Sequence, residues 1–557
     1  MSFWRRLGSG LAKPARWGAL VAGALPVLAF PAPNLEFLAW FALVPGLLLM
    51  RAAPSAREAA VRAWWFGAGF IVAAHYWLLP SIGPALLLVA IVLGVCWAGV
   101  GVSAWALLRP PMTARRSLAA LVVVPSFWLL VEWIRSWQAL GGPWALLGAS
   151  QWQHPAMLAL ASVGGVWLVS FALVAANTGV VILVTAPRAA LRALGAAAVA
   201  VAAGAGPVAF ALTPPVPPAG YVTVALVQPG FQAHPSVLGT ASQQLTAGLG
   251  PRHPDLIVWG ESSIGLDLRL HHRLLDQLRR LSGTAGAPVL VDQDSVTPAG
   301  KSKVAVLIDS GGIVATYTKT RLVPFGEYIP FRQQLGWLTK ISKAAASNMI
   351  PGDGARVMTA TLPGGRPLRL GVLICYEAAF PDMSRVDTLH GAQLIVYQTS
   401  DSTFQGSWAL AQHASLSAVR AAETGRPVVQ AALTGVSAAF DAQGRQLAWL
   451  GSARRGVAFA RLALVPPSRL TLFDRIGDTV PWAAIAICVL AALVGLNRTH
   501  RPQRLVGIMV DGNRRPVSSV SLSEAIDRDR VPDSPAPGEQ GSELRPGGPA
   551  HRIEKRP

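Results

Sequence analysis

Long apolar segments constrain this chain more than any other feature of its sequence. A helix needs about 20 mostly apolar residues to cross the roughly 30 Å hydrocarbon core of a bilayer. Hydrophobic residues make up 52% of these 557 residues, and charged residues only 14%. The sequence therefore predicts a polytopic helical membrane bundle of about eight spans. We expect the spans near residues 17–33, 37–50, 63–80, 84–108, 117–134, 160–186, 193–213 and 480–496.

Arginine and lysine are distributed unevenly between the two sides of these segments. Basic clusters precede the first segment and follow the second, fourth, sixth and eighth, whereas the other short connections hold only Arg135. Positive charge near the end of a span is retained in the cytoplasm. We therefore expect a multi-pass protein of a bacterial inner membrane with both termini in the cytoplasm. The long segment at 218–479 then faces the extracytoplasmic side.

The formal net charge of +20 does not indicate a nucleic-acid-binding protein. Such a protein concentrates Lys and Arg on one folded face, whereas the Arg clusters of this chain flank apolar segments and fill both ends. The charge therefore reflects topology, and we expect the bilayer rather than nucleic acid as a partner.

The cysteines limit the chemistry further. Cys96 and Cys488 lie in apolar segments, where a small hydrophobic residue is the ordinary interpretation. Only Cys375 lies in the soluble middle of the chain. Because the sequence has neither a CxxC pair nor a Cys/His cluster, we expect no disulfide framework and no metal site.

The middle segment alternates short buried strands with helical patterns, which is typical of a layered α/β domain. We therefore divide the chain into a transmembrane bundle at 1–217, an α/β domain at 218–479, a last transmembrane helix at 480–497 and a disordered cytoplasmic tail at 498–557. The expected strands are 222–227, 256–259, 289–291, 304–308, 370–374 and 394–397, and the expected helices are 269–282 and 408–424.

Glu261, Lys319 and Cys375 form a chemically complete set within this domain. Each follows a strand or lies in a turn rich in Pro and Gly. A thiol is a useful nucleophile only as the thiolate, which needs a proton acceptor or a nearby cation. Glu261 would be the acceptor, and Lys319 would lower the thiol pKa or stabilise the oxyanion of a tetrahedral intermediate. Together they predict acyl transfer through a Cys375 thioester.

Each of these residues alone has a simpler interpretation. Cys375 alone is more often a small buried residue. Lys319 alone is most often a solvated loop charge, and Glu261 an acid near a helix N-terminus. Their joint setting favours catalysis.

Polar residues of the helix expected at 408–424 are interpreted as structural. His413 on a helical stretch is more often a satisfied structural histidine than a base. Arg420 and Glu423 have the spacing of an ordinary i,i+3 pair.

The motifs around these residues resemble the apolipoprotein N-acyltransferase family, a membrane-embedded branch of the nitrilase (carbon–nitrogen hydrolase) superfamily. The strongest match is Lys-Thr-Arg-Leu-Val-Pro-Phe-Gly-Glu-Tyr-Ile-Pro at 319–330, followed by Cys-Tyr-Glu at 375–377 and Trp-Gly-Glu at 259–261. The chain departs from the family at 400–406, where Ser-Asp-Ser-Thr-Phe-Gln-Gly replaces Asn-Asp-Ala-Trp-Phe-Gly, and at 431–434, where Ala-Ala-Leu-Thr replaces a Thr-Asn pair.

The resemblance implies a nitrilase-like αββα sandwich whose catalytic triad is Glu261, Lys319 and Cys375. It implies roles for five further residues: Glu327 and Glu377 as supporting acids, and Trp259, Tyr376 and Phe404 as candidates for the substrate pocket.

The reaction implied by the resemblance has two steps. Cys375 takes an acyl group from a membrane phospholipid, and the α-amine of a diacylglyceryl-cysteine lipoprotein then takes it from the thioester. Neither a metal nor an organic cofactor is expected, and the protein is expected to act as a monomer. Two alternatives stay open: a membrane-anchored amidase of the nitrilase type, and an inactive lipid-binding or transport scaffold.

Overall fold

The computed structural model describes residues 14–499 except 215, 231–234, 299 and 341–347. The tail that the sequence predicts to be disordered lies outside these residues from position 500 onward.

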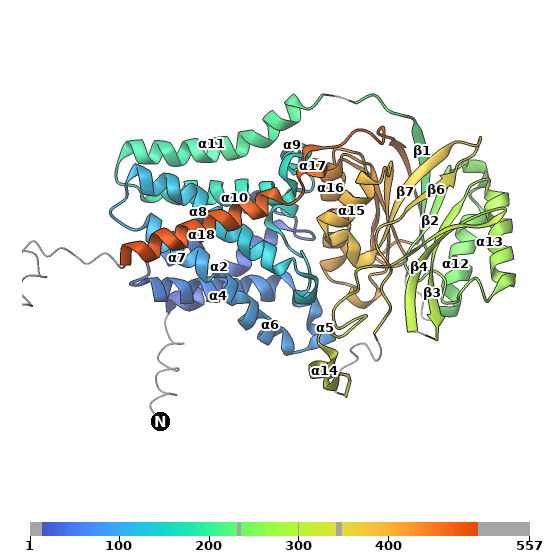
Figure 1. Cartoon of the computed structure of the whole chain (residues 1–557), viewed down its shortest axis with the longest axis horizontal. Coiled ribbons are helices and arrows are strands. Elements are labelled where there is room, and N and C mark those ends of the chain that lie inside the picture. Colours follow the sequence, from blue (N-terminus) through green and yellow to red (C-terminus); the bar gives the residue numbers. More distant parts are fainter. Residues whose placement is uncertain (1–13, 215, 231–234, 299, 341–347, 500–557) are drawn as a thin grey trace, which may run out of the picture. The chain divides into compact units, whose positions relative to one another are not determined.

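Residues 14–212 and 479–499 form packed helices, which are called the helical half below (Figure 1). Within the described residues, four helices are long and apolar enough to cross a membrane, and a fifth span results if Ala56–Ala74 and Tyr76–Ile82, bent by 58°, count as one. Pro14–Ala29 and Thr479–Gly495 are shorter apolar helices. The predicted number of about eight spans is therefore not confirmed. The helices are α2 (Pro14–Ala24), η1 (Leu25–Ala29), η2 (Glu36–Trp40), α3 (Val44–Arg51), α4 (Ala56–Ala74), η3 (Tyr76–Leu78), α5 (Leu79–Ile82), α6 (Ala85–Gly94), η4 (Val95–Trp97), α7 (Ala98–Leu108), α8 (Ala114–Arg135), η5 (Gln138–Leu140), η6 (Leu147–Gln151), α9 (Pro155–Leu158), α10 (Ala161–Thr185), α11 (Ala189–Leu212) and α18 (Thr479–Thr499).

The span expected at 37–50 is not one helix. Its chain forms η2 and then α3, whose eight residues extend only about 12 Å. The backbone between them is satisfied from α10, because Asn177 Oδ1 accepts from Leu43 N at 3.0 Å and Asn177 Nδ2 donates to Ala39 O at 2.8 Å. Non-helical backbone at membrane depth is tolerated where protein buries it. Here the buried Asn177 amide gives hydrogen-bond partners to the backbone at the break.

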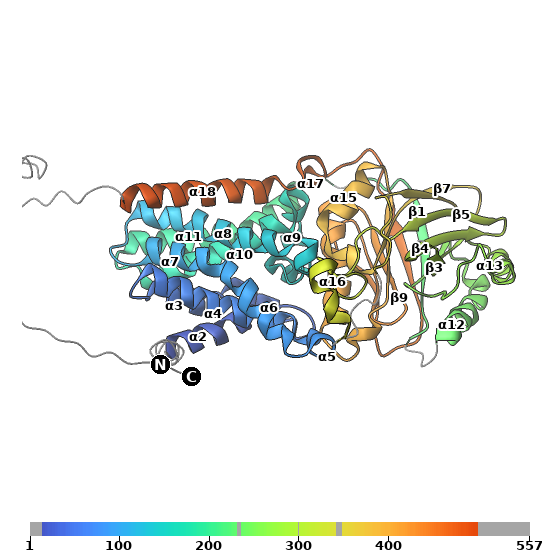
Figure 2. The same cartoon turned by 60° about the horizontal axis from the view of Figure 1, so that its bottom comes forward.

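Two β-sheets packed face to face form the core of the second half. Their strand orders are β12-β1-β2-β3-β4-β5 and β11-β10-β9-β8-β7-β6. Helices α12 and α13 cover the outer face of the first sheet, and α15 and α16 that of the second (Figure 1, Figure 2). The expected αββα sandwich is confirmed. Its elements are β1 (Tyr221–Gln228), α12 (Pro235–Ala247), η7 (Gly250–Arg252), β2 (Leu256–Trp259), α13 (His272–Ala285), β3 (Val289–Thr297), β4 (Gly300–Asp309), β5 (Gly312–Thr318), α14 (Arg332–Leu335), η8 (Gly336–Lys340), β6 (Val357–Thr361), β7 (Pro367–Ile374), η9 (Cys375–Ala379), α15 (Pro381–Leu389), β8 (Leu394–Thr399), η10 (Ser402–Phe404), α16 (Ala409–Thr424), β9 (Val428–Ala432), β10 (Ser437–Phe440), β11 (Gln446–Leu450), β12 (Gly456–Ala463) and α17 (Leu472–Ile476).

Apolar runs in the sequence predicted six of the twelve strands that the described residues form. All the expected strands are present, as β1, β2, β3, β4, β7 and β8, and the two expected helices are α13 and α16. The sequence analysis missed β5, β6, β9, β10, β11 and β12. Strands β5, β6, β11 and β12 have exposed or half-buried positions and so lack a continuous buried run, whereas β9 and β10 are fully buried but only five and four residues long.

A buried acid of α16 connects the sandwich to the helices. Helix α10 is kinked at Gly164 and Gly165, and Gly165 has φ +70°. Glu423 Oε1 accepts from the backbone N–H of Val166 at 2.8 Å, so it caps the helix that resumes after the kink. Glu423 Oε2 also lies 3.1 Å from Arg420 Nε, and both side chains are buried. The predicted i,i+3 pair is therefore confirmed, although it is not a surface pair.

Replacing Glu423 by Ala should strongly destabilise the protein. The change removes the Val166 cap and leaves the Arg420 charge buried without its partner, which costs about 3–5 kcal/mol. Glu423→Gln keeps an acceptor for Val166 and should cost less. Thermal unfolding of the purified protein in detergent measures both. The control is Glu36→Ala, because Glu36 pairs with a half-exposed His154. A Glu423→Ala protein as stable as that control would contradict the assignment.

Candidate active site

Glu261 and Cys375 follow strands of opposite sheets. Glu261 comes two positions after β2, and Cys375 directly follows β7. Both strands have parallel neighbours. A Cβ at Gly260 would lie 2.1 Å from the backbone nitrogen of Leu433, so only glycine lets the two sheets approach this closely. Across this contact, Glu261 N donates to Thr399 O at 3.1 Å. The approach of the sheets therefore delivers Glu261 to the side of the sandwich that carries Cys375.

Lys319 connects the acidic residues of the site. It directly follows β5, and its side chain is fully buried. Its Nζ lies 3.0 Å from Glu261 Oε1 and 2.8 Å from Glu327 Oε1. The Cys375 thiol is close enough to the Glu261 carboxylate that each group shifts the pKa of the other. The structure thus brings together the carboxylate, the ammonium and the sulfur that the sequence analysis selected.

The charges of this site determine where its protons lie. Burial lowers the pKa of Lys319, but Glu261 and Glu327 outweigh it and hold that pKa well above its ordinary value. Burial opposes ionisation of Glu261, yet Lys319 and Lys303 hold its pKa below the ordinary value. Burial and the Glu261 charge raise the pKa of the Cys375 thiol well above its ordinary value. At neutral pH the site therefore holds an ammonium, a carboxylate and a protonated thiol, so that Glu261 can act as the base.

The two further acids of the resemblance hold the surrounding loops. Glu327 binds Lys319 through Oε1 and accepts from Val323 N through Oε2 at 2.9 Å. Glu377 Oε1 accepts from the backbone of the loop after β5, at 2.7 Å from Thr320 N, and its Oε2 accepts from Ile374 N at 2.7 Å. Glu377 therefore fixes the lysine loop against the end of β7, and its oxygens point into the protein rather than toward a substrate.

Left-handed backbone conformations occur at this site in residues other than glycine. Cys375 has φ +52°, Ser262, next to Glu261, has φ +52°, and Phe325, close to Glu327, has φ +62°. Such conformations are costly for residues with a Cβ and persist where the surroundings hold them. The backbone therefore presents the Cys375 side chain from a sharp turn at the end of a strand.

The pocket candidates lie in two different environments. Trp259 is fully buried among the apolar residues under α12 and α13, and its Nε1–H donates to Thr246 Oγ1 at 3.0 Å. This position is typical of a core residue, and its assignment to the pocket stays a prediction.

Tyr376 and Phe404 face residues of the helical half instead. The Tyr376 hydroxyl lies 3.5 Å from the carbonyl oxygen of Gln138, and the Phe404 ring packs edge-on against Trp77 at 4.7 Å between centroids. Both side chains are half-buried. They therefore connect the α/β domain to the helices, and their assignment to the substrate pocket stays a prediction.

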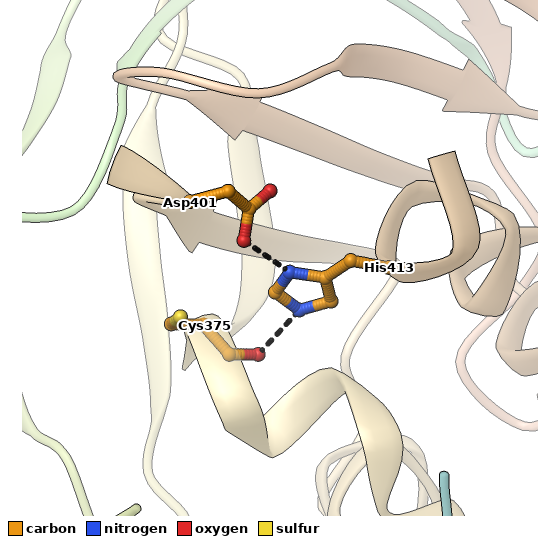
Figure 3. A group of neighbouring side chains, drawn as sticks. All are labelled: Cys375, Asp401 and His413. Atoms are coloured by element: carbon orange, nitrogen blue, oxygen red, sulfur yellow. Dashed lines mark hydrogen bonds and ion pairs between the residues drawn. The ribbon is translucent and has the colours of Figure 1, made fainter. Parts of the chain in front are cut away.

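Asp401 and His413 are site residues that the sequence analysis missed. His413 lies between the Asp401 carboxylate and the backbone carbonyl of Cys375 (Figure 3). A carboxylate oxygen of Asp401, a ring nitrogen of His413 and the Cys375 sulfur all lie within 4.8 Å of one another. These three residue types can bind a metal ion. However, both ring nitrogens of His413 already contact oxygen atoms, so a metal would have to displace one of these contacts. The interpretation of His413 as a structural histidine is therefore incomplete.

A second missed group lies behind Glu261. Asp292 Oδ1 accepts from Ser262 N at 2.7 Å, and Lys303 Nζ contacts Ser262 Oγ and lies 2.9 Å from Asp294 Oδ1. Burial raises the pKa of Asp292 to about 8. The signal in the sequence was an acid inside an apolar strand, in Val-Leu-Val-Asp at 289–292.

The raised thiol pKa predicts slow, strongly pH-dependent alkylation of Cys375. Only the thiolate reacts, so the rate with iodoacetamide should still be rising between pH 8 and pH 10, above the ordinary thiol pKa of about 8.5. The rate is measured by mass spectrometry in a Cys96→Ala/Cys488→Ala background, with N-acetylcysteine as the control. A plateau below pH 8 would show that Cys375 rests as a thiolate.

Comparisons with known proteins identify the family of the chain. Residues 22–179 match the family model of the apolipoprotein N-acyltransferase N-terminal domain, and residues 255–465 match that of carbon-nitrogen hydrolase. The chain is 31% identical to the apolipoprotein N-acyltransferase of Allorhizobium ampelinum, over 77% of this chain and 84% of that protein. It is 29% identical to that of Chlorobaculum tepidum, over 86% and 96%, and 30% identical to that of Rhizobium meliloti, over 85% and 94%. The chain therefore belongs to the apolipoprotein N-acyltransferase family.

Proposed function

We propose that this protein transfers a fatty acyl group from a membrane phospholipid, through a Cys375 thioester, to the N-terminal amine of diacylglyceryl-cysteine lipoproteins. The observation that carries the proposal is the buried contact of Lys319 with Glu261, whose carboxylate lies near the Cys375 thiol and raises its pKa. The names of the relatives support the acyl acceptor class.

In the first step, the Cys375 sulfur attacks the ester carbonyl carbon of the phospholipid, and Glu261 takes the thiol proton. The tetrahedral intermediate then collapses, the bond to the glycerol oxygen breaks, and Glu261 returns the proton to that oxygen. A lysophospholipid leaves, and the acyl group stays on the sulfur. In the second step, the lipoprotein amine attacks the thioester, Glu261 accepts its proton, and an amide forms while Cys375 regains the proton.

Lys319 is placed to stabilise the oxyanion of both steps. An ammonium has three N–H donors, and among the described residues two carboxylates accept from it. The third donor is then available to the developing oxyanion, and a well-placed donor of this kind contributes roughly 3–4 kcal/mol to catalysis. Glu327 takes no proton in these steps, so the ammonium keeps one carboxylate partner even while Glu261 carries the proton.

The helices fit both substrates, because each is a lipid whose chains stay in the bilayer. The half-buried Tyr376 and Phe404 contact residues of the helical half, which supports entry of an acyl chain from that side. A small polar amide would need none of these helices. We also propose that the transmembrane bundle ends at residue 217 and that the α/β domain covers residues 218–479. A single copy of the chain would carry out catalysis.

The transferase predicts a fatty-acyl adduct on Cys375 when the purified protein meets phospholipid vesicles. Intact-mass spectrometry should show the adduct in wild type and none in Cys375→Ser. Lys319→Met should slow adduct formation by 10²–10³-fold, as expected for loss of an oxyanion donor. The matched control is Lys301→Met, because Lys301 is exposed.

Addition of a diacylglyceryl peptide with a free amine should then discharge the adduct into an amide. Discharge into free fatty acid alone would identify a hydrolase instead. Absence of any adduct in wild type would favour a scaffold that has lost turnover.

The proposed topology places the α/β domain outside an inner membrane and both termini in the cytoplasm, from the distribution of Arg and Lys. Asp276 and Arg57 are both exposed, on α13 and at the start of α4. In a background without Cys96 and Cys488, Asp276→Cys should react with a membrane-impermeant maleimide in intact spheroplasts, whereas Arg57→Cys should react only after lysis. The reverse pattern would invert the topology.

A further inference from the structure

The two ring nitrogens of His413 both face acceptors. Nδ1 lies 2.9 Å from Asp401 Oδ1, and Nε2 lies 3.1 Å from the carbonyl oxygen of Cys375 (Figure 3). His413 and Asp401 are each 3% exposed, so bulk water does not replace either contact. A carboxylate and a backbone carbonyl only accept hydrogen bonds, whereas a neutral imidazole has a single N–H. A neutral ring would therefore turn a lone pair toward one of the two oxygens.

A protonated ring satisfies both contacts at once. Burial lowers the pKa of His413, but the charge of Asp401 and the hydrogen bonds to Asp401 and Cys375 outweigh it and raise that pKa above its ordinary value. Glu261 is the other charged group that favours the cation. The indole of Trp144 lies 5.9 Å from the imidazole ring, a distance at which an aromatic ring also favours a cation.

The backbone that His413 contacts is the turn of the nucleophile itself. Cys375 holds φ +52° directly after β7, and its carbonyl oxygen is the acceptor of the Nε2 contact. A charged donor makes a stronger hydrogen bond than a neutral one. The ring also places positive charge near the Cys375 sulfur, on the side of Asp401, whose own charge raises the thiol pKa.

We propose that His413 is a permanent imidazolium, held by Asp401, that locks the left-handed backbone of Cys375 and compensates the Asp401 charge beside its sulfur. The proposal rests on the proposed function only in treating Cys375 as the nucleophile. His413 is then a positioning residue. Because both of its ring nitrogens carry protons, it cannot take the thiol proton, and that role is left to Glu261.

Asp401 is itself held in place to serve this pair. Its backbone N–H donates to Thr434 O at 2.9 Å, and its Oδ2 packs against Gly435, where a Cβ would lie 2.5 Å from that oxygen. The helical half contributes on the other side of the ring, since Trp144 Nε1–H donates to Gln412 Oε1 at 2.9 Å. The pair therefore has little freedom to rotate out of contact with Cys375.

The protonation state is tested directly by NMR of the full chain in detergent with ¹⁵N-labelled histidine rings. The His413 signal is assigned from its loss in His413→Gln. Both of its nitrogens should show protonated-ring shifts at pH 8, and Asp401→Asn should convert them to those of a neutral ring. A neutral ring in wild type at pH 8 would overturn the proposal. This measurement needs no substrate, so it stands whether or not acyl transfer is observed.

The effect on Cys375 is tested by the pH profile of its alkylation, in a background without Cys96 and Cys488. His413→Gln leaves the Asp401 charge uncompensated, so the profile should move up by about one pH unit or more, a roughly tenfold lower rate at fixed pH. Asp401→Asn/His413→Gln removes both charges and should return the profile toward wild type. A merely structural role would not give this rescue. An unshifted single variant, or a double variant that stays shifted, would overturn the proposed compensation.

Discussion

The buried ammonium of Lys319 is the interaction on which this site depends. A charge removed from water is tolerated only when it is paired and hydrogen-bonded, and Lys319 has Glu261 and Glu327 at 3.0 and 2.8 Å. Glu261 arrives from the end of β2, whereas Lys319 follows β5 and Glu327 lies further along the same loop. These residues come from one sheet and Cys375 from the other, so the packing of the two sheets must complete the site. Gly260, which admits the Leu433 backbone, is therefore as necessary to the chemistry as the charged residues.

Three segments of the helical half hold the sandwich through hydrogen bonds. Trp144 reaches Gln412, Gln138 Nε2 donates to Leu322 O at 2.9 Å, and the chain after Gly165 receives the carboxylate of Glu423. Most of these contacts involve loops or kinks, where backbone groups lack helical partners. Such an arrangement keeps the nucleophile close to the helices that meet the lipid.

Sequence patterns predicted the elements whose physics is local and missed those that depend on partners. The strand ends that carry Glu261 and Cys375 follow apolar runs, which periodicity detects. The break at Phe41–Leu43 was not detectable, because it is stable only where Asn177 supplies hydrogen bonds from more than a hundred positions away. His413 was interpreted as structural for the same reason: its contacts with Asp401 and Cys375 arise from three separate segments. Such residues show no periodicity of their own.

The departure at 400–406 can now be separated into positions that touch the nucleophile and positions that do not. Ser400 lowers the pKa of the Cys375 thiol through its backbone, so a change of side chain from the family's Asn leaves this effect in place. Asp401 and Phe404 coincide with the Asp and Phe of the family pattern, and they are the residues that contact His413 and Trp77. The lost tryptophan corresponds to Thr403, which is exposed. An exposed aromatic residue contributes little to folding, so this departure changes the surface offered to an acyl chain and leaves the machinery around Cys375 intact.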